Sequence, residues 1–183
     1  MVNIARSKLL EWFRYEPETG LVYWQKRPAR GGYNTKVGDV AGTINDRAGR
    51  RAPRRVLWLG KQRIVAARAI YTMVHGDIPN SAMIDHADGN TLNDRIDNLR
   101  LASAVQNTWN RIGLDAIRKG VAKDIRGRFK ARIATPDGKI NLGTWDTEAE
   151  AHAAYMGAAA ILHGEYWLGN RKHAATAIGN RRA

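Results

Sequence analysis

The segment Met83–Asn107, MIDHADGNTLNDRIDNLRLASAVQN, limits the possible fold more than any other part of the chain. Its sequence predicts a short strand that carries Asp85-His86 and a return strand directly after Asn98. A capping-box pattern at Ser103 then predicts a helix that carries Asn107. A carboxylate, an imidazole and two amides would therefore lie on three neighbouring elements, where their side chains can converge.

Two interpretations of these polar side chains are open. Asp and Asn are common in turns, and Asp88-Gly89-Asn90 is expected to do no more than form one. Alternatively, the side chains form a hydrolytic site. A neutral imidazole near pH 7 is a suitable base for water, and a carboxylate with an amide oxygen is a ligand set for Mg²⁺. An amide oxygen that accepts a hydrogen bond from the N–H of one imidazole nitrogen would leave the other nitrogen unprotonated and so fix the tautomer. Hydrolysis of a phosphodiester bond needs groups of these kinds.

The charge of the chain indicates its partner. Thirty Lys and Arg residues stand against 17 Asp and Glu, which gives a net charge of +13 over 183 residues. This balance favours a polyanion, most simply nucleic acid, and an acidic membrane surface is the rival interpretation. No apolar run is long enough to span a membrane, and no signal peptide opens the chain. The absence of cysteine excludes disulfides and thiolate zinc sites and fits a cytoplasmic location.

The first 76 residues have the patterns of short helices and strands. A helix is expected from Ala5, ended by Pro17 and Gly20, because Leu9, Leu10 and Phe13 have helical spacing. Further predicted elements are strands within 20–27 and 37–44, a hairpin over 54–66 with its turn at Gly60-Lys61, and a helix over 67–76. Basic residues are dense from Arg47 to Arg68, a stretch without any acidic residue.

The segment Ile125–Ile133, IRGRFKARI, alternates cations with apolar residues. A strand with this period of two would place four cations on one face, opposite an apolar face. A turn at Thr135–Gly138, a further strand and a Thr147-capped, Ala-rich helix to Gly164 follow. The pattern predicts a three-stranded sheet backed by one helix over residues 119–169, after a linker at 112–118 and before a basic tail at 170–183.

The spacing Asp85-His86, Asn98, Asn107 resembles the motif of HNH nucleases, particularly phage and intron-encoded members in which asparagine takes the last position. The resemblance implies a ββα-metal core, with Asp85 and Asn107 as metal ligands, His86 as general base and Asn98 as the residue that orients His86. One departure lies upstream, where the chain has Ala67-Arg68 and the family often has His-Arg.

Residues 119–167 resemble the DNA-binding domain of the plant APETALA/ethylene-response factors, which is also found attached to phage HNH nucleases. The matching landmarks are Gly120-Val121, Gly127, Phe129, Ala131, Ile133, Leu142–Trp145 and His163-Gly164. Ala122 and Asp124 stand where the plant domains have DNA-contacting arginines, and Arg126 replaces a tryptophan. The base sequence that plant proteins recognise is therefore not carried over.

Several side chains are expected to contact DNA, because a small sheet fits the major groove and its cations suit guanine edges and phosphates. The expected contacts are Arg126, Arg128, Lys130 and Arg132, with Lys123 and Lys139 on phosphates and Arg55 and Arg63 on a second surface. Trp145 could contact DNA or pack in the core, whereas Phe129, Ile133 and Leu142 are expected in the core. The other histidines offer no zinc spacing, and the helix dipole would favour a cation at His163.

Together these patterns predict an α+β protein: an HNH nuclease region with an N-terminal helix and hairpins at 1–111, followed by the sheet-and-helix domain. The expected function is metal-dependent hydrolysis of DNA, with one Mg²⁺ or Mn²⁺ per site and no zinc. A monomer with one site would nick one strand of duplex DNA, in the host cytoplasm if a phage encodes the protein. The alternative is a non-catalytic DNA-binding regulator.

Overall fold

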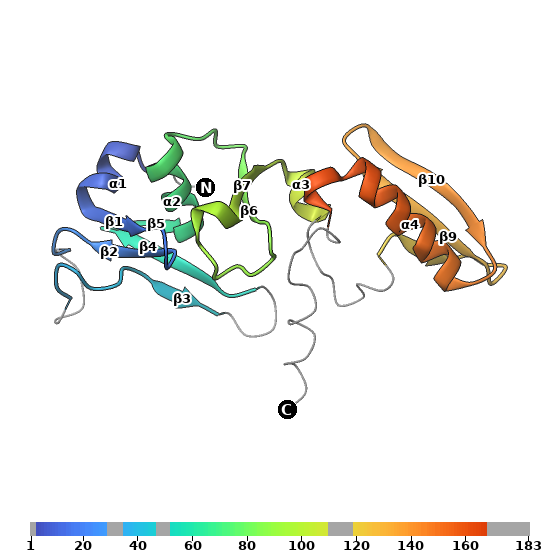
Figure 1. Ribbon diagram of the computed structural model, residues 1–183, viewed down its shortest axis with the longest axis horizontal. Coiled ribbons are helices and arrows are strands. Elements are labelled where there is room, and N and C mark those ends of the chain that lie inside the picture. The colour runs from blue at the N-terminus through green and yellow to red at the C-terminus, as the bar shows by residue number, and fades with distance from the viewer. Residues whose placement is uncertain (1–2, 29–34, 47–51, 110–118, 168–183) are drawn as a thin grey trace, which may run out of the picture. The chain divides into compact units, whose positions relative to one another are not determined.

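The computed structural model describes residues 3–28, 35–46, 52–109 and 119–167 (Figure 1). The chain forms two compact units, Met1–Ser103 and Ala104–Ala183. Both contain helices and strands, as expected for the α+β class. The expected linker at 112–118 and the basic tail at 170–183 lie outside the described residues. None of the described helices combines the length and the apolar character needed to cross a membrane.

The first unit consists of short elements that pair as antiparallel hairpins. Strands β1 and β2 form one pair, β3, β4 and β5 form a sheet, and β6 pairs with β7. In chain order the elements are α1 (Arg6–Trp12), β1 (Phe13–Glu16), β2 (Leu21–Trp24), β3 (Thr43–Asn45), β4 (Arg54–Leu59), β5 (Gln62–Val65), α2 (Ala66–His75), β6 (Met83–His86), the 3₁₀ turn η1 (Ile96–Asn98) and β7 (Leu99–Ala102).

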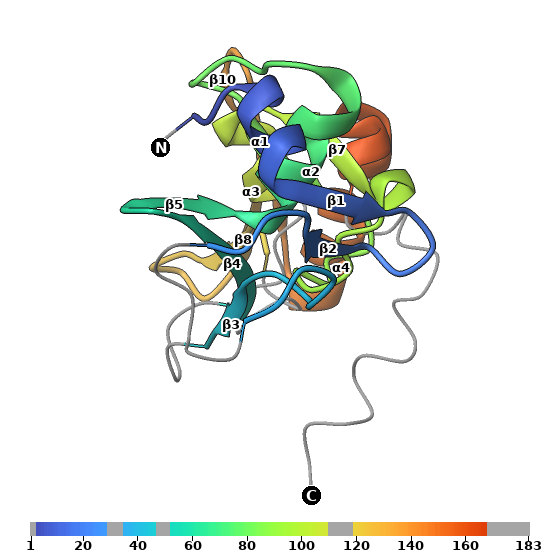
Figure 2. The ribbon, with the colours of Figure 1, turned by 90° about the vertical axis from the view of Figure 1, so that its left-hand side faces the viewer.

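Helix α2 lies at the centre of the first unit, where it packs against α1, β4, β5 and β6. Its apolar side chains share one core with residues of α1, β1 and β4, and Leu9, Phe13, Leu57 and Ile70 are completely buried. Figure 2 shows α1 and the β1–β2 hairpin on the near side of this unit. The core therefore fixes α2, and with it the start of β6.

The chain after Trp12 differs from the sequence-based expectation. The predicted helix was to continue toward Pro17, but Phe13 is already extended, with φ −132° and ψ 143°, and β1 begins there. Phe13 pairs with Trp24 of β2, and Phe13 is buried in the core. Strand pairing and aromatic burial therefore outweigh the helical spacing.

The hairpin and the helix that follow agree with the predictions. Strands β4 and β5 are joined at Gly60-Lys61, where Gly60 has φ 62°. Helix α2 ends at Gly76, which has φ 95° and donates its N–H to the carbonyl of Thr72. Glycine is the residue that enters this left-handed region without strain, so both turns are encoded locally.

The second unit is a three-stranded antiparallel sheet in the order β10-β9-β8, with α4 on one face. Ala131 and Ile133 of β9 are completely buried against Ala151, Tyr155 and Ala159 of α4. The elements in chain order are α3 (Ala104–Trp109), β8 (Val121–Lys123), β9 (Phe129–Thr135), β10 (Gly138–Trp145), α4 (Glu148–Leu162) and the 3₁₀ turn η3 (Gly164–Tyr166).

Strand β9 is shorter than the alternation in IRGRFKARI indicates, because residues 124–128 form a turn. The Asp124 carboxylate accepts hydrogen bonds from the backbone N–H groups of Arg126 and Arg128, each at 2.9 Å. Gly127 has φ 83° at the corner. The prediction that Arg126 and Arg128 belong to the strand is therefore wrong, and Ile125, expected on the apolar face, is fully exposed.

Candidate active site and cationic groove

The β6–β7 hairpin carries two buried titratable side chains side by side. Asp85 pairs across the hairpin with Arg100, and His86 pairs with Leu99. Asp85 is 6% exposed and His86 is 7% exposed. Because successive residues of a strand point to opposite faces, the two side chains leave β6 in different directions. Each therefore has its own set of partners.

His86 is held by a residue that the sequence analysis did not single out. Its Nε2 lies 2.9 Å from Oδ1 of Asp94, and the Asp94 side chain is 2% exposed. An ionised carboxylate has only acceptors, so Nε2 carries the proton and Nδ1 is the nitrogen with the basic lone pair. The pair fixes one imidazole tautomer, which is a requirement for a general base.

Asn98 has partners other than those expected. Its Oδ1 accepts the backbone N–H of Asp88 at 3.0 Å, and its Nδ2 donates to Asp88 Oδ1 at 2.9 Å and to the carbonyl of Asn93 at 2.8 Å. Its own carbonyl accepts the N–H of Ala87 at 2.9 Å. The expectation that the amide would bond the imidazole of His86 is corrected: Asn98 braces the loop after His86, because that loop's backbone groups need partners.

Asp85 forms an ion pair with its cross-strand neighbour. Its Oδ2 accepts hydrogen bonds from Arg100 Nε at 2.9 Å and from Arg100 Nη2 at 2.8 Å. The carboxylate is therefore held in one orientation by a guanidinium group whose side chain is 16% exposed. Opposite charges directly across an antiparallel pair stabilise it, so this partner follows from the register.

Asn107 lies on α3, half-buried and in the second unit, whereas Asp85, His86 and Asn98 lie in the first. The structure therefore brings three of the four expected residues onto one hairpin and its loop. That Asn107 lies beside these three residues remains a prediction. Within the described parts of the chain, no group of three or more His, Cys, Asp or Glu side chains could hold a metal ion.

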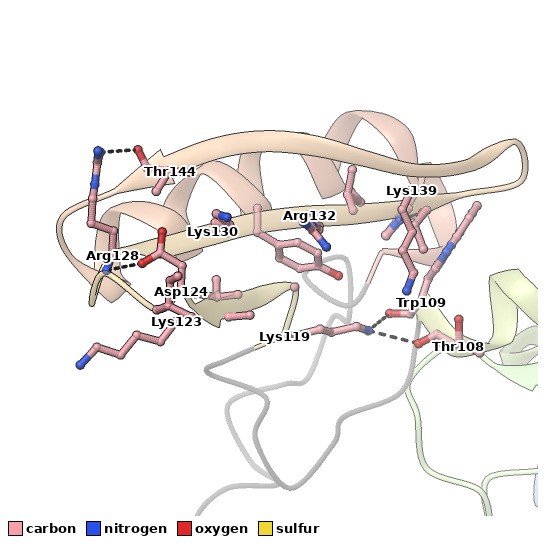
Figure 3. Close-up of a pocket in the computed structure, with 18 of the residues that line it drawn as sticks. Thr108, Trp109, Lys119, Lys123, Asp124, Arg128, Lys130, Arg132, Lys139 and Thr144 are labelled. Atoms are coloured by element: carbon pink, nitrogen blue, oxygen red, sulfur yellow. Dashed lines mark hydrogen bonds between the residues drawn. The ribbon is translucent and has the colours of Figure 1, made fainter.

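The second unit contains a groove with many cations in its lining, which we call the cationic groove (Figure 3). Its volume is about 1050 Å³. Asp124 is the one acidic residue in its lining. Its basic side chains are Lys119, Lys123, Arg126, Arg128, Lys130, Arg132 and Lys139. It thus holds all six cations that the sequence predicts as DNA contacts in this unit.

The cations of the groove differ in the hydrogen bonds and ion pairs that their side chains make within the protein. Arg128 donates to the carbonyl of Thr144 at 3.1 Å and pairs with Asp146 at 3.1 Å. By contrast, Lys130, Arg132 and Lys139 make no side-chain hydrogen bond or ion pair with any described residue. Lys130 and Arg132 alternate on β9 with the buried Ala131 and Ile133, so they lie on the sheet face away from α4.

Asp124 keeps its negative charge among these cations. Partial desolvation raises the pKa of the Asp124 carboxyl, but the N–H groups of Arg128 and Arg126 and nearby cations such as Lys130 outweigh this effect and hold the pKa below its ordinary value. The carboxylate therefore stays ionised and maintains the turn that presents the two arginines.

The apolar residues that the sequence predicts in the core of this unit pack there. Ile133 is buried, and Phe129 and Leu142 are half-buried against the same core. Trp145, for which two roles were open, also packs against this core. His163 differs from the expectation of a cation: it is 3% exposed, and burial lowers its pKa. Its ring stacks on Trp109 with a centroid distance of 4.1 Å.

The described residues of the basic stretch from Arg47 to Arg68 do not form a single surface. Arg68 is internal: its guanidinium donates to Asn3 and to the carbonyls of Ala82 and Pro79. Arg55 is half-buried and pairs with Ile44, whereas Arg63 is exposed and pairs with Trp58. From this register Arg55 and Arg63 lie on opposite faces of the sheet. The residues 47–51 lie outside the described part.

Comparison with known proteins gives one family match and two relatives. Residues 65–108 match the family model described as HNH endonuclease. An uncharacterized HNH endonuclease of Acanthamoeba polyphaga mimivirus is 34% identical over 114 residues, which are 62% of this chain and 59% of that protein. Protein 3.8 of Escherichia phage T7 is 51% identical over 41 residues, 22% of this chain and 34% of that protein. No solved structure matches.

The chain thus spans about three fifths and one third of the lengths of these two viral relatives. The matched segment begins at Val65, at the end of β5, and includes α2, β6, the loop with Asp94 and β7. It supports the expectation of an enzyme, a hydrolase that acts on DNA. Residues 65–108, with His86 and its hairpin, are therefore similar to HNH endonuclease domains.

Proposed function

We propose that this protein is a metal-dependent endonuclease that hydrolyses phosphodiester bonds in duplex DNA. The observation that carries the proposal is the buried His86, whose Nε2 is held at 2.9 Å by Asp94 within the segment that matches HNH endonucleases. A histidine fixed in one tautomer at the end of a strand is suited to accept a proton from water.

His86 is the general base of the proposed reaction. Its Nδ1 takes a proton from a water molecule while the water oxygen bonds to phosphorus. The bond between phosphorus and the leaving oxygen then breaks, and the leaving oxygen takes up a proton from solvent. Asn98 acts indirectly, because its hydrogen bonds to Asp88 and Asn93 fix the loop that follows His86.

The donor chemistry fits a hard divalent cation. Asp85 offers a carboxylate and Asn107 an amide oxygen, the ligand types that Mg²⁺ takes together with water and phosphate oxygens. Arg100 donates two hydrogen bonds to Oδ2 of Asp85, which orients the carboxylate. One Mg²⁺ or Mn²⁺ bound there would neutralise charge on the phosphate and the leaving oxygen. The set lacks thiolates and a histidine cluster, so it does not match zinc.

The second unit is proposed to bind the DNA duplex through the cationic groove. Lys130, Arg132 and Lys139 have no ion-pair partner among the described residues, and such cations favour a polyanion. Lys130 and Arg132 lie on the open sheet face, where a small sheet can enter the major groove. We also propose that the second unit is a DNA-binding domain of the APETALA/ethylene-response-factor type, as the sequence resemblance implies. Arg63 is a further candidate contact on the first unit.

One site per chain makes nicking by a monomer the expected outcome. A double-strand cut would then need a dimer or a second event. Both relatives are viral proteins. We therefore propose that the protein acts in the cytoplasm of an infected host cell.

The test is plasmid cleavage. Supercoiled plasmid is incubated with the protein and Mg²⁺ or Mn²⁺, with and without chelator, beside His86→Ala. We expect nicked circles from the wild type only when metal is present, and none from His86→Ala. His152→Ala, which changes a histidine of α4, is the matched control and should cut normally. A wild type that shifts DNA in a gel but never cuts it would favour the non-catalytic regulator.

A further inference from the structure

We propose that Asp94 is a positioning residue for His86, and that the β1–β2 hairpin holds the backbone of Asp94 in place. Asp94 lies eight positions after His86. Its catalytic meaning rests on the proposed nuclease function, but the hydrogen bond itself can be tested without any activity.

The surroundings of Asp94 set it apart from the other carboxylates of the hairpin. Asp85 pairs with Arg100, and Asp97 pairs with Arg95 at 3.1 Å. Asp94 has no such cation among the described residues, although its side chain is 2% exposed. Its Oδ1 faces the imidazole, and its Oδ2 has no hydrogen-bond partner in the described structure.

The burial of the Asp94 carboxylate fixes the position of the proton on His86. A carboxylate removed from water is costly unless it is hydrogen-bonded, so the proton on His86 Nε2 is retained at this bond. The same bond prevents the ring from flipping, because a flip would turn a carbon toward the carboxylate. Asp94 therefore determines which nitrogen of His86 can accept a proton and where that nitrogen points.

The hairpin formed by β1 and β2 supports the backbone of Asp94. The hydroxyl of Tyr15 accepts the N–H of Ile96 at 2.8 Å and donates to the carbonyl of Asp94 at 3.4 Å. Tyr15 thus bridges both ends of the short segment 94–96. This bridge joins residues about 80 positions apart in the sequence.

The turn between β1 and β2 makes a second, closer contact with the same segment. Arg95 donates to the carbonyl of Glu18 at 2.7 Å. Gly20 has φ 72°, and a Cβ added there would lie 2.7 Å from the backbone N of Arg95 and 2.8 Å from the carbonyl carbon of Asp94. Backbone cannot move aside as a side chain can, so only glycine allows this approach.

The first experiment measures the tautomer of His86 by ¹H–¹⁵N NMR of the full-length protein, at a pH where the imidazole is neutral. The resonance is assigned by its loss in His86→Ala. We expect a slowly exchanging Nε2–H in the wild type, and its loss or fast exchange in Asp94→Ala and Asp94→Asn. A proton on Nδ1 in the wild type, or an unchanged Nε2–H in both variants, would overturn the assignment.

The second experiment measures plasmid nicking by Asp94→Asn, which is nearly isosteric. We expect kcat to fall about 10- to 100-fold, with KM for DNA changed by less than about twofold, because the partner of a functional imidazole acts on the reaction and not on binding. Asp137→Asn removes an exposed carboxylate in the turn between β9 and β10 and should leave kcat and the tautomer unchanged. An Asp94→Asn enzyme with wild-type kcat would contradict the role.

The third experiment compares two glycines with positive φ. Gly20→Ala and Gly38→Ala carry the same kind of backbone strain, but a Cβ at Gly38 meets nothing within 4 Å. We expect only Gly20→Ala to shift or broaden the His86 Nε2–H resonance and to lower kcat. If the two variants behave alike, the β1–β2 hairpin does not hold Asp94 in the proposed way. If the wild type does not cut DNA, the nuclease proposal fails, while the NMR result still decides the positioning role.

Discussion

At the scale of single residues, the β6–β7 hairpin contains two buried carboxylates with different kinds of partner. Asp85 is paired with a guanidinium group, and Asp94 is paired with an imidazole. The guanidinium group holds the Asp85 carboxylate in one orientation, whereas the Asp94 carboxylate holds the N–H of an imidazole. The two residues therefore differ in what a substitution should change.

Replacing Arg100 should change stability. Arg100→Gln leaves the Asp85 carboxylate buried without its guanidinium, which should lower the free energy of unfolding by about 3 kcal/mol. Urea denaturation of the first unit measures this loss. Adding Asp85→Asn removes the buried charge, so the double variant should recover part of the stability. Strictly additive effects, within about 0.5 kcal/mol, would show that the pair does not couple.

His163 should make the second unit sensitive to acid. Burial lowers the pKa of His163, and the nearby Lys119 lowers it further, against the hydrogen bond to the carbonyl of Ala134. Below the ordinary histidine pKa of about 6.5, the unfolded chain therefore takes up a proton that the folded protein refuses, and stability falls with pH.

Thermal unfolding at several pH values measures this effect of His163. His163→Gln keeps a donor for the carbonyl of Ala134 but has no titrating ring, so its melting temperature should fall less between pH 7 and pH 5. His152→Gln is the matched control. A wild-type and a His163→Gln protein with parallel pH profiles would contradict the assignment.

The sequence identifies some of these residues and not others, for physical reasons. The sequence predicts Asp85 and His86 on a strand and Asn98 directly before the return strand, which is where they lie, and Arg100 follows once the register is known. Asp94 lies in a loop without any period, among other Asp and Asn residues. Its burial depends on Tyr15 and Gly20, and a contact over about 80 residues leaves no local pattern.

At the scale of elements, the glycine-containing turn of the β4–β5 hairpin and the glycine end of α2 were the most predictable features. The β4–β5 hairpin and α2 lie where the sequence predicts them. The first helix ends early because Phe13 and Trp24 pair across β1 and β2, a tertiary effect. The alternation at Ile125–Ile133 is misleading because Asp124 and Gly127 form a turn inside it. Turn chemistry therefore overrides a short alternating pattern.

Helix α4 allows a direct test of its start. Thr147 and Glu150 form a reciprocal capping box, in which each side chain accepts the backbone N–H of the other residue. Thr147→Ala should lower the free energy of unfolding of the second unit by about 1 kcal/mol. Thr147→Ser keeps the hydroxyl and should be close to wild type, as measured by urea denaturation. Equal losses in both variants would assign the effect to the methyl group instead.

At the scale of the whole molecule, the net charge of +13 should govern how DNA binding responds to salt. Removing one cation that neutralises a phosphate should reduce the slope of log affinity against log salt by about 0.9. Lys130→Gln with Arg132→Gln should therefore flatten the slope by about 2 if both side chains bind phosphates, as measured by fluorescence anisotropy on a duplex.

The control for the salt experiment is Lys26→Gln, which removes an exposed cation that is already paired with Glu11 at 2.7 Å. This variant should bind DNA with the wild-type slope. If the double variant keeps the wild-type slope as well, the open sheet face does not bind the DNA, and the proposal for the second unit fails.

The close contact of Gly20 with the Asp94–Arg95 backbone bears on how the segment that matches HNH endonucleases could be moved between proteins. The family match covers residues 65–108, but the hairpin that supports Asp94 lies at Phe13–Trp24, outside it. A transplant limited to the matched segment would carry His86 and Asp94 without the surface that aligns them. The shortest segment that keeps this arrangement therefore begins before β1. A host protein that receives a shorter segment must supply an equivalent hairpin.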